Sequence, residues 1–188
     1  MTRFVVFCCL LSMPIMSFAQ LTVSPKAGIN YLWVGSRPQG FDRAGAEQGW
    51  QAGLDLRLGK RFYFQPGVYY VSTGATISSL EDIKNIKTGN ASFMKIPVNV
   101  GYKLINSQLF KLRVHGGGTA NKLLATRDGG ALSASDFEPW NYGANVGAGI
   151  DLLFLALDIN YEWGLTNMYS NNKNSLPTMA SISVGLKF

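Results

Sequence analysis

Apolar and polar residues alternate with a period of two along most of the chain after residue 20. The last segment shows this most clearly, because one parity carries only apolar side chains: Ala180, Ile182, Val184, Leu186 and Phe188. The other parity carries serine, glycine and lysine. Since successive side chains of a strand point to opposite faces, the pattern predicts strands with one apolar and one polar face.

Eight segments show this alternation, at residues 26–33, 50–58, 62–70, 94–104, 110–115, 141–152, 155–166 and 180–188. Several reach the roughly ten residues that a tilted strand needs to cross hydrocarbon. Short turns are expected at Gly59-Lys60, Asn106-Ser107 and Leu153-Phe154, and longer polar links at roughly 35–47, 75–91, 123–138 and 168–176. Short and long connections in alternation predict an all-β fold, an eight-stranded antiparallel up-and-down transmembrane β-barrel with periplasmic turns and outer loops.

The aromatic residues distinguish a membrane barrel from a soluble, ligand-carrying barrel, which has an apolar interior and a wet exterior. All four tryptophans have the parity of the apolar face and fall toward the loop-side ends of their segments: Trp33, Trp50, Trp140 and Trp163. Toward the turn side, the same face carries Phe62, Tyr102, Phe110 and Phe188. Two aromatic girdles around an aliphatic band are typical of a barrel that faces lipid.

The polar face is therefore predicted to line the lumen, where its charges need partners. We expect one satisfied network of side chains, formed by Lys26, Asp55, Arg57, Lys95, Lys103, Lys111, Arg113, His115, Asp151, Asp158, Glu162 and Lys187. The network could be a plug that holds the barrel closed, or it could line a path for solutes. Inward glycines at 117, 143, 147 and 149 make room for Tyr63 and Tyr69 or leave a small cavity. Pro66 and Pro97 predict a bulge or another irregularity in their strands.

The N-terminal segment differs from the rest. Arg3, the apolar run from Phe4 to Leu11 and the small residues of Ser17-Phe18-Ala19 predict a signal peptide over 1–19 and a barrel domain over 20–188. Both cysteines fall inside this signal peptide, so the mature chain would have no thiol chemistry. The net charge of +6 is spread singly between apolar residues, which argues against nucleic acid as a partner.

No catalytic residue, cofactor or metal site is expected. His115 is the only histidine, and a hydrolytic site with Ser181 or Ser183 and Asp158 is conceivable but would lie in mid-strand, away from the loops that substrate can reach. One histidine without cysteine also argues against zinc.

Two segments resemble strands of the PorT-like outer-membrane β-barrel family. They are residues 62–70, with the sequence FYFQPGVYY and Gly74 following, and residues 94–103, with the sequence MKIPVNVGYK. The resemblance covers essentially the whole mature chain and implies a small bacterial outer-membrane barrel, with some members linked to protein secretion. Its expected partners are outer-membrane lipid, the barrel-assembly machinery, which would read the C-terminal Phe188, and a protein or surface ligand at the loops. A structural or interaction role, a narrow channel and an outer-membrane enzyme are the competing functions.

Overall fold

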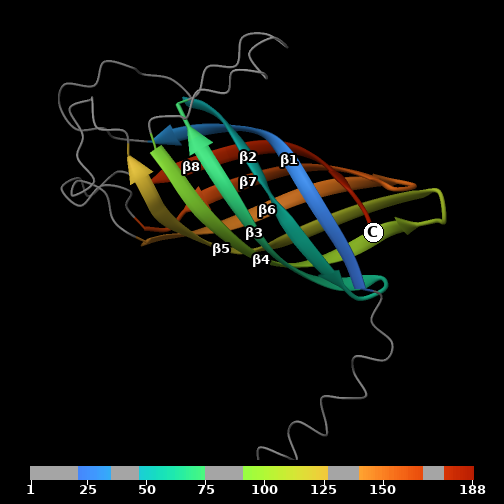
Figure 1. The fold of residues 1–188 in the computed structure, drawn as a ribbon. Coiled ribbons are helices and arrows are strands. Elements are labelled where there is room, and N and C mark those ends of the chain that lie inside the picture. The colour runs from blue at the N-terminus through green and yellow to red at the C-terminus, as the bar shows by residue number, and fades with distance from the viewer. Residues whose placement is uncertain (1–20, 35–46, 75–90, 127–139, 167–175) are drawn as a thin grey trace, which may run out of the picture.

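The computed structural model is a closed barrel, and it describes residues 21–34, 47–74, 91–126, 140–166 and 176–188. The expected signal peptide and most of the long links lie outside the described residues. The strands are β1 (Leu21–Val34), β2 (Glu47–Leu58), β3 (Phe62–Thr73), β4 (Ala91–Asn106), β5 (Phe110–Thr126), β6 (Trp140–Leu152), β7 (Leu155–Gly164) and β8 (Pro177–Leu186). In Figure 1 the strands form a ring, and each strand is tilted relative to the barrel axis. Within the described part, no helix has the length and apolarity needed to span a bilayer.

Each strand pairs antiparallel with its neighbours in sequence, and β1 closes the ring against β8. The closing register runs from Lys26 opposite Gly185 to Val34 opposite Pro177. Two backbone hydrogen bonds between Val23 and Phe188 extend it, at 3.0 and 2.9 Å. The predicted eight-stranded up-and-down barrel is therefore confirmed. A closed ring leaves no unpaired strand edge.

One boundary needs correction, and one expected irregularity is confirmed. The link predicted from residue 123 begins later, because Leu123 pairs with Phe93 and Thr126 pairs with Ala91, which extends β5. The β3–β4 ladder is interrupted between Pro66 and Tyr69 without a change of register. Its prolines therefore cause an irregularity and no bulge, and the register shifts of β4 lie at Ser92/Phe93 and Lys103/Ile105.

The outward face is apolar over its whole height. Its exposed side chains are mostly Leu, Val, Ile and aromatic residues. At the loop-side end, Thr178 of β8 pairs with Trp33 of β1 on one side and with Trp163 of β7 on the other. The two tryptophans therefore lie at the same height along the barrel. At the turn-side end, the rings of Phe62 and Tyr102 lie 4.7 Å apart.

The turn-side rim is uneven. The β2–β3 turn is basic, with Lys60 and Arg61 exposed, and Gly59 adopts a φ of 126°. The β6–β7 turn is Leu153-Phe154, whose side chains are 58% and 59% exposed. In a ring of eight strands these two turns lie on opposite sides of the barrel. Leu153 has a φ of 51°, a left-handed conformation that costs a leucine roughly 1–2 kcal/mol.

Candidate functional site: the lumen of the barrel

The inward parity brings most of the predicted polar residues into the interior of the barrel. Ten of the twelve are buried: Lys26, Asp55, Arg57, Lys95, Lys103, Arg113, His115, Asp151, Asp158 and Glu162. The other two, Lys111 and Lys187, are partly buried. Arg113 is fully buried. An arginine is almost never fully buried unless its charge is paired with an opposite charge.

An alternating chain of charges crosses the middle of the lumen. Lys26 Nζ lies 2.6 Å from both Asp55 Oδ2 and Asp158 Oδ2. Arg113 then joins Asp158, at 2.6 Å from Nη2, to Asp151, at 3.0 Å from Nε. Arg57 Nη1 continues the chain from Asp151 at 2.9 Å. The connected residues come from β1, β2, β5, β6 and β7, so the chain ties strands on different sides of the ring.

Neutral side chains complete this network. Gln65 Nε2 donates to Asp55 at 2.8 Å, and its Oε1 accepts from Arg57 Nε at 3.3 Å. Gln51 Nε2 donates to Ser183 Oγ at 2.8 Å. A buried charge is costly without a partner. These contacts therefore allow so many charged side chains to lie in the interior.

A second ion pair lies closer to the loop side. Lys95 Nζ is 2.7 Å from Glu162 Oε2. The other carboxylate oxygen accepts from Thr119 Oγ1 and Asn121 Nδ2, each at 2.8 Å. Lys95 Nζ also lies 3.0 Å from Met179 Sδ. Glu162 thus has charge-assisted partners on both oxygens.

The loop-side part of the interior also contains buried apolar side chains, which the sequence analysis missed. A buried hydrophobic cluster there consists of Leu32, Tyr69, Val71, Ala91, Phe93 and Met179. Val71 is completely buried, and it pairs with Phe93 in the β3–β4 register. These residues have the inward parity, which could have identified them. The many charged residues of the same parity led instead to the prediction of a uniformly polar lumen.

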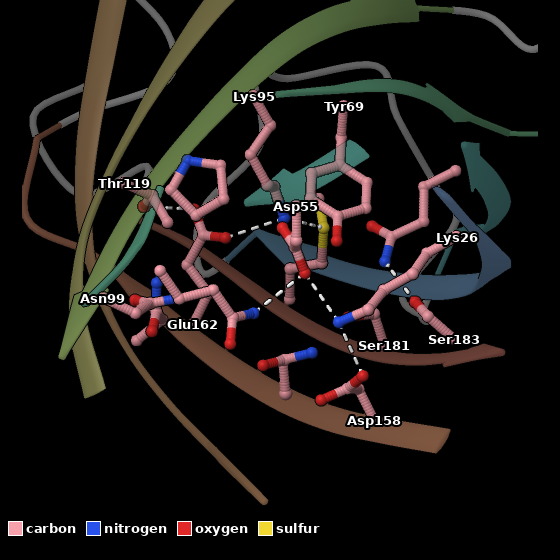
Figure 2. A pocket seen from close by; sticks show the side chains of 16 residues that line it. Lys26, Asp55, Tyr69, Lys95, Asn99, Thr119, Asp158, Glu162, Ser181 and Ser183 are labelled. Carbon is pink, nitrogen blue, oxygen red and sulfur yellow. Dashed lines mark hydrogen bonds and ion pairs between the residues drawn. The ribbon is translucent and has the colours of Figure 1, made fainter. Parts of the chain in front are cut away.

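A small polar cavity lies between the two ion-pair groups (Figure 2). Lys26, Asp55, Asp158 and Ser183 line one side, and Lys95 and Glu162 line another. It has room for only a few water molecules. Three buried amide oxygens of lining residues have no hydrogen-bond partner in the described part of the chain: Gln51 Oε1, Asn99 Oδ1 and Asn145 Oδ1.

The inward glycines have a more specific role than expected. A Cβ on Gly149 would meet the guanidinium of Arg113, and one on Gly147 would meet the His115 ring. The space for Tyr63 comes instead from Gly101. The glycines of β6 therefore accommodate the charged network and His115, not the tyrosines.

The chemistry considered for His115 is not assembled. Its Nε2 lies 2.6 Å from Asn160 Oδ1, while Asp158 is paired with Lys26 and Arg113. Ser183 Oγ accepts from Gln51. Over the described residues, no three His, Cys, Asp or Glu side chains are arranged to hold a metal ion.

The family model described as "Outer membrane protein beta-barrel domain" matches residues 18–170. No curated protein matches this sequence. Neisserial surface protein A is a structural neighbour with a TM-score of 0.60 and 15% identity, covering 90% of this chain and 99% of that chain. Two further neighbours have TM-scores of 0.45. Ail, the attachment invasion locus protein of Yersinia pestis, is 12% identical and covers 89% and 98% of the two chains. OprG from Pseudomonas aeruginosa is 10% identical and covers 91% and 97%.

At 15% identity, Neisserial surface protein A shows the fold alone, and the family model carries the assignment. It spans most of the chain, and the closed ring with its apolar exterior agrees with it. The chain belongs to the outer membrane protein β-barrel domain family and is a small eight-stranded barrel of the bacterial outer membrane.

Proposed function

We propose that this barrel is a closed membrane anchor that acts through its extracellular loops, in a structural role or by binding a partner. The observation that carries this proposal is the filled lumen. An eight-stranded barrel is just wide enough for its own side chains to fill it. Here the ion-pair chain occupies the middle, and the hydrophobic cluster around Val71 and Phe93 covers its loop side.

Conductance in planar bilayers tests this proposal directly. We expect the purified protein to give conductance at the background level, while a porin inserted in the same way gives discrete steps. Steady open channels from the wild-type protein would contradict the closed-anchor proposal. The Phe93→Gly variant removes a whole aromatic side chain from the apolar cluster and tests whether that cluster is the barrier.

A narrow channel for small solutes is the second candidate, and the polar cavity favours it. That cavity holds amide oxygens without protein partners, as a hydrated path would. This candidate predicts that Gly147→Trp, which places bulk against His115, slows liposome swelling with small solutes. Gly118→Trp is the matched control, because Gly118 faces outward into open space. Equal swelling rates for both variants and the wild type would count against a channel.

The partner of the loops is a separate question. The resemblance of residues 62–70 and 94–103 to PorT-like strands supports an association with protein secretion. A cross-linked pull-down from intact outer membrane would test it, with a variant whose 75–90 loop is replaced by a glycine-serine linker as the comparison. Recovery of the same proteins with both forms would argue against recognition through that loop.

We also propose that the barrel is not an enzyme. The separate hydrogen-bond partners of His115, Asp158 and Ser183 support this view. If outer-membrane vesicles containing the protein hydrolyse a lipid or peptide ester, and His115→Ala abolishes that activity without loss of folded protein, this part of the proposal is wrong.

A further inference from the structure

The turn-side end of the lumen carries far more positive than negative charge. Four basic side chains meet there, and we call them the basic mouth: Arg57, Lys103, Lys111 and Lys187. They come from β2, β4, β5 and the residue after β8. The side-chain carboxylate that pairs with them is Asp151, which lies 2.9 Å from Arg57 and 3.6 Å from Lys187. Asp151 is also shared with Arg113.

The rest of the lumen is balanced, so this excess is local. Lys26 and Arg113 are matched by Asp55 and Asp158. The positive charge of Lys95 is matched by the negative charge of Glu162. Deeper carboxylates therefore have their own cations and cannot neutralise the mouth.

The cations of the mouth are incompletely bonded. Lys103 is 5% exposed, yet within the described ranges the hydrogen bond from its Nζ is a long one, 3.5 Å, to the Gly59 carbonyl. Arg57 is 2% exposed, and its Nη2 is a buried donor without a partner among the described residues. Lys111 lies opposite Asp151 in the β5–β6 register, but no ion pair joins them in the described part of the chain.

An aromatic ring supplies part of the compensation. The Tyr63 ring lies 5.4 Å from the Arg57 guanidinium and 5.9 Å from Lys103 Nζ. Each such contact is a weak attraction between a cation and the face of the ring. This is less than a formal negative charge would provide at close range, and it leaves the mouth positive.

The neighbouring cations also act on Lys187, which lies just beyond the end of β8. Burial lowers the pKa of its ammonium; Asp151 opposes that effect, and the charges of Lys111 and Arg57 lower the pKa further. Lys103 experiences the same neighbours, Lys111, Arg57 and Lys187. The four cations thus form one electrostatic group.

We propose that the basic mouth is an anion-binding site that takes one phosphate group, entering from the turn side of the barrel. Converging ammonium and guanidinium donors suit an anion with several oxygens. Inorganic phosphate carries between one and two negative charges near neutral pH and the phosphodiester of a phospholipid carries one, so either would reduce the excess positive charge. The phosphate comes either from solution or from the headgroup of a phospholipid in the periplasmic leaflet. This inference goes beyond the closed-anchor function and does not depend on whether the lumen conducts.

The test is a titration of inorganic phosphate into the folded protein in maltoside micelles, followed by calorimetry in a buffer without other multivalent anions. We expect saturable binding at one site. The Lys103→Gln/Lys111→Gln variant should weaken it at least tenfold. The matched control is Lys122→Gln, which removes the same charge from β5 near its other end and should leave binding unchanged.

A second variant and a second ligand complete the design. Lys187→Gln changes only a partly exposed residue and should weaken phosphate binding severalfold even if the double variant does not fold. Native mass spectrometry with phosphatidylglycerol or with phosphate-free diacylglycerol distinguishes the sources. Selective retention of phosphatidylglycerol by the wild type, lost in Lys187→Gln, identifies a headgroup; phosphate binding without retention identifies a soluble anion. Binding of neither ligand, or equal binding by wild type and Lys187→Gln, would overturn the proposal.

Discussion

Arg113 is the residue whose removal should cost the barrel most. It is fully buried on β5 and bridges Asp158 at 2.6 Å and Asp151 at 3.0 Å. In Arg113→Met, an unbranched apolar side chain replaces the arginine and both contacts are lost. Breaking a buried ion pair by removing one partner typically costs about 3–5 kcal/mol.

The network sets where in this range the loss should fall. Asp158 keeps Lys26 at 2.6 Å, and Asp151 keeps Arg57 at 2.9 Å. Because each carboxylate retains one cation, we expect the lower end, a loss of about 3 kcal/mol in the free energy of unfolding. Adding Asp158→Asn removes the carboxylate that has lost one of its two cations, so the double variant should lose less than the sum of its parts by about 0.5–3 kcal/mol.

Reversible urea unfolding in phospholipid vesicles, followed by tryptophan fluorescence, measures these differences. The matched control is Lys122→Met on the same strand, an exposed residue whose ammonium lies 5.5 Å from the Trp140 ring. It should change stability by no more than about 1 kcal/mol. An Arg113→Met loss no larger than that of the control would refute the view that the ion-pair chain is a cooperative unit.

Three further substitutions probe other parts of the barrel, all by the same unfolding assay. Gly149→Val should destabilise by at least about 1–3 kcal/mol, because its side chain meets Arg113, whereas Gly118→Ala in open space should be neutral; equal effects would contradict the packing argument. Phe93→Ala should cost about 3–5 kcal/mol by opening a cavity in the apolar cluster, and a smaller loss would mean that the cluster collapses around the gap. Leu153→Asn should destabilise the barrel in phospholipid vesicles although it relieves a left-handed strain of roughly 1–2 kcal/mol, because the leucine side chain contacts acyl chains; a gain in stability would contradict that contact.

The period-two alternation was sufficient to predict the fold. Parity also assigned residues such as Lys26 and Arg113 to one face and Trp33 and Trp163 to the other, without knowledge of any contact. This works because a strand between two different environments has only two ways to point a side chain. The strand ends were less certain, as the extension of β5 to Thr126 shows, because pairing with β4 continues after the hydrophobic pattern has ended.

The partners inside the lumen could not be predicted in the same way. Lys26 meets Asp55 from the adjacent strand β2 and Asp158 from β7, and the second contact depends on the stagger and tilt of the closed ring. The apolar cluster was overlooked for a different reason. Leu32 and Val71 have the same parity as the polar residues. In the sequence alone, an apolar side chain at such a position looks like an exception to the pattern. Its contact with Phe93 and Met179 becomes evident only once the barrel is closed.

The unequal turns of the rim bear on how the cylinder sits in its bilayer. Lys60 and Arg61 favour the headgroup layer, where a cation can reach lipid phosphate, whereas Leu153 and Phe154 on the far side favour acyl chains. An upright barrel would hold both turns at one depth and satisfy only one of them. We therefore expect the barrel axis to be tilted relative to the bilayer normal. The Leu153-Phe154 turn would then lie among the acyl chains of the inner leaflet, and the Lys60-Arg61 turn would lie at the surface of that leaflet.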